Sequence, residues 1–190
     1  MEFHGCIAIT GSPGVGKTTL AHLLSEALEF EIQSIESIAG QSNCLGGKDE
    51  TDNTILIDTN CLQQQTQFLG KDCIVEGHLS HFIPSNIIIL LRCHPMVLKQ
   101  RLEKRAYIES KIIENVEWEF LGGAWTEISQ LERQTPVLEF DTSNEDEESI
   151  CQKVIQKLLN TSFSSFSIQE HIDWIEEAEI DVKMFDASQL

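Results

Sequence analysis

The sequence lacks any long apolar stretch and carries few positive charges. Its longest uninterrupted apolar run is residues 87–91, and Arg92 follows, so no segment is long enough to cross a bilayer. Residues 1–10 lead into a glycine-rich loop without a basic and then apolar leader, so we expect no secretion signal and a cytoplasmic location. The net charge of -18 argues against affinity for bare nucleic acid, whose phosphates require a basic face.

Cysteine is present but lacks the spacing of a metal or redox motif. None of the six cysteines forms a Cys-x-x-Cys pair, and several lie in apolar, strand-like runs. Because a disulfide framework requires an exported context, we predict buried and reduced thiols rather than disulfides or metal ligands. The six positions are Cys6, Cys44, Cys61, Cys73, Cys93 and Cys151.

Acidic residues are concentrated toward the end of the chain. Residues 139–190 contain 13 Asp and Glu against three lysines. The simpler interpretation is a solvated, solubilising surface. The alternative is a docking surface for a basic protein.

Apolar patterns predict an α/β fold with a five-stranded parallel sheet and helices on both faces. With 190 residues, 41% of them hydrophobic, the chain fits one domain, residues 1–160, and an acidic tail, residues 161–190. The composition of three further segments predicts a mobile loop at residues 40–54, a linker at 161–167 and a short helix at 168–178. The predicted strands are 3–10, 31–35, 72–76, 86–92 and 137–141, and the predicted helices are 17–28, 59–69, 95–104, 110–132 and 146–159.

A phosphate-binding loop follows the first predicted strand. The run Gly-x-x-x-x-Gly-Lys-Thr over residues 11–18 opens a helix, which is the setting that a Walker A motif requires. Its glycines let successive backbone N–H groups point at phosphate oxygens, and the helix N-terminus adds positive charge. We expect Lys17 to reach the β- and γ-phosphates and Thr18 to ligate Mg²⁺. The predicted ATP-binding residues of this motif are Gly11, Gly14, Val15, Gly16, Lys17, Thr18 and Thr19.

A second motif follows the strand that ends at Glu76. A carboxylate at the carboxyl end of such a strand predicts a Walker B acid that holds Mg²⁺ through water. The alternative is an acid that simply faces solvent. His78 is interpreted as a polar group that positions water or substrate beside the phosphates, and a structural histidine is the competing interpretation.

The chain also has only four arginines, of which Arg101 and Arg105 share a helix face and predict a lid over the phosphates. Arg92 fits a phosphate contact or a structural ion pair equally well. We therefore expect catalysis from Lys17, His78, Arg101 and Arg105.

Together these motifs resemble the adenylate-kinase-like ribosome-assembly NTPases of the coilin-interacting nuclear ATPase type, and especially their archaeal adenylate kinase branch. The resemblance extends from about residue 5 to 159 and rests on the P-loop and on residues 47–50, 75–81, 91–93 and 101–115. It implies a P-loop NTPase fold of the nucleoside monophosphate kinase type, with an NMP-binding arm at about 34–57 and a short lid at about 104–114. It also implies ATP binding by Arg105 and a Walker B role for Glu76 and His78.

The resemblance further implies the reaction ATP + AMP to two ADP, an ATPase activity, and small-subunit ribosome maturation with a basic ribosomal protein as partner. One departure matters: residues 37–40 read Ser-Ile-Ala-Gly where the family has Asp-Leu-Ala-Arg, so Gly40 replaces an arginine that binds AMP. Losing that contact should cost about 2–3 kcal/mol of acceptor binding, which Lys48 could offset only in part. Three functions remain open: a weak AMP kinase, an ATPase that serves assembly, and a kinase of another small metabolite.

Overall fold

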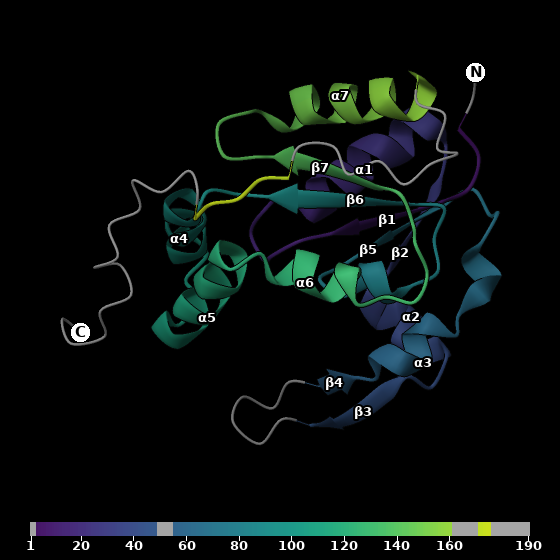
Figure 1. The fold of residues 1–190 in the computed structure, drawn as a ribbon, viewed down its shortest axis with the longest axis horizontal. Coiled ribbons are helices and arrows are strands. Elements are labelled where there is room, and N and C mark those ends of the chain that lie inside the picture. Colours follow the sequence, from purple (N-terminus) through teal and green to yellow (C-terminus); the bar gives the residue numbers. More distant parts are fainter. Residues whose placement is uncertain (1–2, 49–54, 161–170, 176–190) are drawn as a thin grey trace.

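The computed structural model describes residues 3–48, 55–160 and 171–175 (Figure 1). A five-stranded parallel sheet in the order β2-β5-β1-β6-β7 forms its centre. The predicted α/β fold and its sheet are therefore confirmed. The strands are β1 (Cys6–Thr10), β2 (Glu31–Ser34), β5 (Cys73–Glu76), β6 (Ile87–Arg92) and β7 (Val137–Asp141).

Alternating strand residues pack against helices on opposite faces of the sheet. Ile7 and Ile9 of β1 join one core cluster with α1 (Lys17–Leu28) and α7 (Glu147–Asn160), two helices that contact each other, and Figure 1 shows α7 above the sheet and α1 behind β6 and β7. Ala8 points to the other face, where it packs with α6 (Gly123–Ser129). Because both faces are covered, the central strands β1, β5 and β6 are apolar up to their last residues, which is why they could be predicted from the sequence.

The helix predicted over residues 110–132 is wrong as one element. It consists of α5 (Glu109–Phe120) and α6, separated at Gly122, which has a φ of 63°. A Cβ on the next residue, Gly123, would lie 2.3 Å from Nε1 of Trp118, so a side chain at that position would force the Trp118 ring to move. The preceding helix, α4 (Pro95–Lys104), agrees with the predicted bounds.

The segment between β2 and β5 forms an arm of helices and a small hairpin. It contains α2 (Ile35–Gln41), the antiparallel strands β3 (Leu45–Lys48) and β4 (Ile55–Ile57), α3 (Thr59–Gln63) and a 3-10 turn at Thr66–Phe68. A second 3-10 turn, Ser80–Phe82, follows β5 and lies outside this segment. The loop predicted over residues 40–54 is therefore partly helix and strand, and residues 49–54 lie outside the described residues. The helix predicted over 59–69 is shorter than expected.

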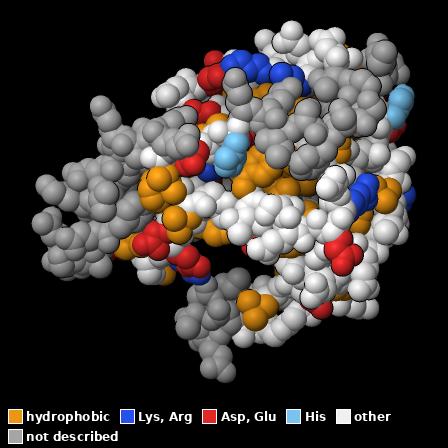
Figure 2. Space-filling view, viewed as in Figure 1, with side chains coloured by type: hydrophobic (Ala, Val, Ile, Leu, Met, Phe, Trp, Pro, Cys, Tyr) orange, Lys and Arg blue, Asp and Glu red, His pale blue; other side chains and the backbone are white. Residues whose placement is uncertain are grey.

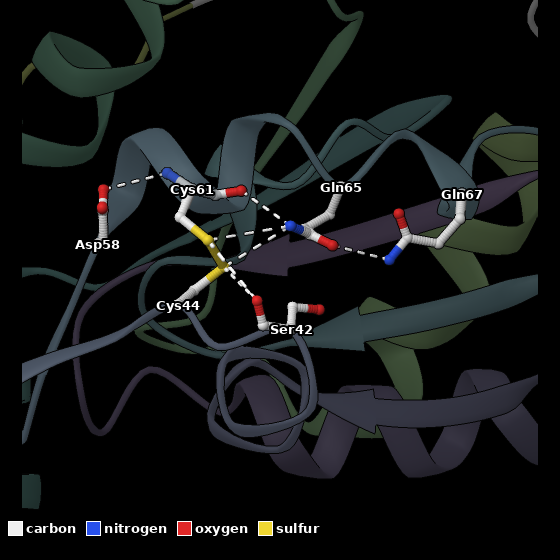
Figure 3. Close-up of a disulfide and its surroundings, with 6 residues drawn as sticks. All are labelled: Ser42, Cys44, Asp58, Cys61, Gln65 and Gln67. Atoms are coloured by element: carbon white, nitrogen blue, oxygen red, sulfur yellow. Dashed lines mark hydrogen bonds between the residues drawn. A yellow bond between two sulfur atoms is a disulfide. The ribbon is translucent and has the colours of Figure 1, made fainter.

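A disulfide joins the two sides of this arm. Figure 3 shows the bond between Cys44, which follows α2, and Cys61, which lies in α3. The bond therefore encloses the β3–β4 hairpin along the chain. The prediction of reduced thiols is wrong for these two residues and confirmed for the other four cysteines, which are free and buried. The error has a physical cause, because spacing along the chain does not reveal that the hairpin brings positions 44 and 61 together.

Only five residues of the predicted tail, 171–175, are described. They are irregular and end in a turn rather than a helix, and Trp174 is 2% exposed. The rest of the predicted linker and helix lies outside the described residues. Within the described part of the chain, no helix has the length and apolar content needed to span a membrane. On the face shown in Figure 2, Asp and Glu side chains are spread among uncharged ones rather than gathered in one patch.

Candidate active site

The phosphate loop connects β1 to α1 in a shape that requires glycine. Gly11 has a φ of 133°, and a Cβ there would lie 2.3 Å from the carbonyl oxygen of Leu91. Gly16 caps α1 with a φ of 103°, again in the left-handed region. Any other residue at these two positions would strain the backbone, so the loop can present its N–H groups as the sequence predicts.

Lys17 lies across this loop. Its Nζ donates to the carbonyl oxygens of Gly11, at 2.9 Å, and Ser12, at 2.8 Å. Burial lowers the pKa of Lys17 to about 8, against the opposing charges of Glu76 and Glu119. The ammonium is thus held in the position from which it can meet a phosphate, and an anion bound there would offset the unfavourable effect of burial.

Thr18 and Glu76 come together beside Lys17. Thr18 Oγ1 donates to Glu76 Oε2 at 3.2 Å. Hydroxyl and carboxylate oxygens are the hard ligands that Mg²⁺ prefers, so this pair fits the predicted metal. The described residues contain no group of three or more His, Cys, Asp or Glu that could hold a metal. A magnesium ion at this pair would therefore need further oxygens from a nucleotide and water.

His78 lies directly under the phosphate loop. Its Nδ1 is 3.2 Å from the carbonyl oxygen of Gly11, and its ring lies 4.6 Å from that of Trp118, measured between centroids. Burial lowers the pKa of His78, partly offset by the bond to Gly11, so the ring is neutral at neutral pH. A neutral ring can donate through Nδ1 to the carbonyl oxygen of Gly11, and this hydrogen bond would help to fix the conformation of the loop.

Two cavities meet at the loop. One, of about 280 Å³, is lined by Lys17, Thr18, Glu76 and His78 together with Glu36 of α2 and Tyr107. The other, of about 270 Å³, lies between the loop glycines and the segment after β7, and is lined by Val15, Thr19, Arg101 and Thr142. Arg105 lines both cavities, as Gly14 and Gly16 do. The structure therefore brings the predicted ATP-binding residues of the loop to these two adjoining cavities, apart from Gly11, which lines neither and instead accepts from Lys17.

The two predicted lid arginines differ in their contacts. Arg101 donates to the carbonyl oxygen of Thr142 at 2.6 Å and to its hydroxyl at 3.2 Å, so its guanidinium is tied to the segment after β7. Arg105 ends α4 and is exposed between the cavities. Arg101 lines one cavity and Arg105 lines both, and a lid or catalytic role for either stays a prediction.

A buried ion-pair network behind the loop was not predicted. Arg92 donates to Glu119 and to Glu139 at 2.7 Å each, and all three side chains are at most 2% exposed. Of the two interpretations left open for Arg92, the structure shows the ion pair. A signal for Glu119 was present, because Ile112, Val116 and Glu119 recur at the spacing of one helix face, which places an acid among core positions.

Comparisons with known proteins identify the family of this chain. The family model AAA_18, described as AAA domain, matches residues 7–122. A protein described as "Putative adenylate kinase" from Thermococcus onnurineus (strain NA1) is 34% identical over 171 residues, which cover 90% of this chain and 92% of the relative. One of the same description from Methanocaldococcus jannaschii is 36% identical over 155 residues, covering 80% and 85%.

Solved structures resemble the chain in fold. Shikimate kinase from Acinetobacter baumannii in complex with shikimate superposes with a TM-score of 0.55 at 16% identity, covering 83% of this chain and 94% of that one. Deoxyadenosine kinase from M. mycoides with bound dATP gives a TM-score of 0.53 at 18% identity, covering 82% and 100%. At these identities the likeness concerns the fold alone.

Proposed function

This chain belongs to the adenylate-kinase-like P-loop family that the AAA domain model and the archaeal relatives define, and we propose that it is an ATP-dependent nucleotide kinase with ATPase activity and weak activity toward AMP. The observation that carries the proposal is the meeting of Lys17, Thr18 and Glu76 in one cavity at the phosphate loop. An ammonium beside a hydroxyl–carboxylate pair is suited to a nucleoside triphosphate with its magnesium ion.

The proposed reaction depends mainly on positioning and charge. Lys17 would contact the β- and γ-phosphates, and Arg105, which lines both cavities, would approach the transferred group from the other side. Thr18 and Glu76 would hold Mg²⁺, directly and through water, and the ion would neutralise charge on the phosphates. His78 is held against the loop carbonyl of Gly11, from where it would order the loop or a nearby water.

The weak AMP activity follows from the acceptor side of the site. Glu36 lines the cavity from α2, and Gly40 lies one turn further along the same helix. Residues four apart share a helix face, so the family's arginine would point toward this cavity from position 40. In this chain that face of α2 carries the carboxylate of Glu36, and Gly40 supplies no guanidinium. A phosphate acceptor is therefore bound weakly, and water competes more effectively for the γ-phosphate.

An assembly role with a basic small-subunit ribosomal protein is part of this proposal. The support is the net charge of -18, which would favour a basic partner electrostatically. Pull-down of small-subunit proteins with and without ATP tests it. Nucleotide-dependent capture is expected, and equal recovery with and without ATP would contradict a role that uses turnover.

Product analysis tests the enzymatic proposal. ATP is incubated with Mg²⁺ alone and then with each nucleoside monophosphate, and the products are separated by chromatography. We expect ADP from ATP alone, with a small increase when AMP is present, and loss of both in Lys17→Ala. AMP-stimulated ADP formation at ordinary adenylate kinase efficiency would contradict the weak-AMP part. Absence of Mg·ATP binding by calorimetry would contradict the whole proposal.

A further inference from the structure

Glu119 is a buried carboxylate that bonds directly to the phosphate loop. It is 1% exposed on the inner face of α5. Its Oε2 accepts a hydrogen bond from Ser12 Oγ, the second residue of the loop. Its Oε1 accepts from Arg92 Nε at 2.7 Å and from the backbone N–H of Cys93 at 3.2 Å. A carboxylate with this many donors has a fixed orientation, so it can fix Ser12 in turn.

Ser12 connects Glu119 to the lysine of the loop. Its hydroxyl donates to Glu119, while its carbonyl oxygen accepts from Lys17 Nζ at 2.8 Å. Ser12 is fully buried and lies between these two groups. A change in how Glu119 is held would therefore alter the orientation of the Ser12 peptide and the position of the Lys17 ammonium.

The segment 171–175, far along the chain from the loop, completes this arrangement. Trp174 Nε1 donates to Glu119 Oε1 at 3.1 Å, and its ring lies 5.7 Å from the guanidinium carbon of Arg92. Ile172 accepts from Arg92 through its carbonyl at 3.0 Å and donates its N–H to Glu139 at 2.9 Å. In Figure 1 this segment, drawn in yellow, lies beside the carboxyl ends of β6 and β7. It supplies donors and an acceptor to the buried charges and covers them with the Trp174 ring.

We propose that Glu119 is a positioning residue for the phosphate loop and that Trp174 completes its hold, so that segment 171–175 supports nucleotide binding without touching the nucleotide. The inference rests on the proposed function only in that the loop binds Mg·ATP. Its physical basis is that Glu119 accepts several hydrogen bonds at once. If the donor from Trp174 is removed, the buried carboxylate can shift, and its hydrogen bond to Ser12 shifts with it.

The test compares two tryptophan variants that undergo the same chemical change. Trp174→Phe removes the indole N–H that Glu119 accepts. Trp125→Phe removes the indole N–H that Glu139 accepts at 2.7 Å, at the other end of the same network. Mg·ATP affinity is measured by calorimetry, and hydrogen exchange of loop residues 11–16 is measured in nucleotide-free protein. We expect Trp174→Phe to weaken Mg·ATP binding by roughly three- to tenfold and to speed exchange in the loop.

Trp125→Phe is the matched control and should change the affinity by less than about twofold, because Glu139 bonds to Arg92 and Ile172, whereas Glu119 bonds directly to Ser12 of the loop. Equal weakening by both variants, or a lower melting temperature in Trp174→Phe with unchanged affinity and loop exchange, would overturn the proposal. The exchange readout needs no nucleotide, so a wild type that fails to bind Mg·ATP would contradict the proposed function and leave this inference testable.

Ser12→Ala provides a second variant that does not depend on how well Trp174→Phe folds. Removing the hydroxyl breaks the connection at the loop, so affinity should fall by a similar factor with the tryptophan intact. Adding Trp174→Phe to Ser12→Ala should then weaken binding little further, because both changes act through one path. Wild-type affinity and loop exchange in Ser12→Ala, or independent and fully additive effects, would overturn the proposal.

Discussion

Glu76 Oε2 lies 3.2 Å from Thr18 Oγ1, although 58 positions separate the two residues in the sequence. The parallel pairing of β1 with β5 creates this closeness, because the carboxyl ends of both strands meet at one edge of the sheet. Strand pairing thus places the carboxylate beside the first turn of α1. The arrangement gives the following expectations for the proposed kinase.

Glu76→Gln should reduce turnover roughly 10- to 100-fold, since it removes the charge that would hold the magnesium ion through water. The Mg²⁺ concentration needed for half-maximal activity should rise. Steady-state assays over a magnesium titration measure both. Glu36→Gln is the control, because it removes a carboxylate from the same cavity on α2. An unchanged magnesium dependence in Glu76→Gln would show that the metal lies elsewhere.

Binding of Mg·ATP should take up protons above pH 8. The pKa of Lys17 is about 8 in the nucleotide-free protein, and phosphate charge would raise it. Between these two values the free ammonium is partly deprotonated and the bound one is protonated, so affinity falls as pH rises. At about pH 8.5 calorimetry in buffers of different ionisation enthalpy should detect uptake on the order of half a proton. Lys17→Arg removes the titrating group, and the same uptake in that variant would refute the assignment.

Gly40→Arg should raise AMP turnover, by roughly tenfold or more in kcat/KM, because it restores a charge-assisted contact to the acceptor phosphate. Position 40 can accept the side chain, since a Cβ there would meet nothing within 4 Å. Gly47→Arg, on β3 of the same arm and equally open, adds the same charge on another element. A gain in both variants would indicate a general charge effect, and no gain in Gly40→Arg would mean that α2 does not face the acceptor.

Substitution of Arg105 and of Arg101 should have different effects on the kinetics. Arg105→Ala should lower kcat on the order of a hundredfold, because an exposed guanidinium between the two cavities can meet the transferred phosphate. Arg101→Ala should act mainly on the KM for ATP and on the melting temperature, because it releases Thr142. Full kinetic curves and thermal melts distinguish the two patterns. An Arg101→Ala variant with reduced kcat and unchanged stability would contradict this assignment and support the catalytic role predicted for Arg101 from the sequence.

The parts of the fold that were predictable are those with a local signature. β1 and β6 are apolar up to their last residues, Thr10 and Arg92, because both faces of the sheet are covered, and the phosphate loop has a pattern fixed by its own backbone. Arg92 and Glu119 have no such signature as a pair. Their ion pair depends on how α5 packs against the end of β6, so the sequence could suggest a buried acid on the helix and could not name its partner.

The arm shows the same limit more strongly. Gly46 and Gly47 favoured a loop by composition, yet they lie in β3, which pairs with β4. A short hairpin of this kind gains its stability from the elements around it rather than from local propensity. The disulfide that encloses the hairpin depends on that pairing, and so it was missed together with it.

Reduction of the Cys44–Cys61 disulfide should loosen the arm. The bond closes a loop with a sequence separation of 17 that contains β3 and β4, and a loop of this size loses about 3 kcal/mol of stabilisation when it is opened. Dithiothreitol supplies two electrons and two protons and leaves two thiols. Hydrogen exchange of residues 45–48 and 55–57 should therefore become faster on reduction, while exchange in β1 and β6 stays slow.

The double variant Cys44→Ser with Cys61→Ser separates this effect from other actions of the reagent. It should show the fast exchange of the reduced arm from the start and no response to dithiothreitol, since the remaining cysteines are free and buried. Asp58, which caps α3 by accepting from the Cys61 N–H at 3.0 Å, keeps the helix start intact in that variant (Figure 3). A wild-type arm whose exchange ignores the reductant would mean that the hairpin is held by its packing alone, with the covalent bond contributing nothing measurable.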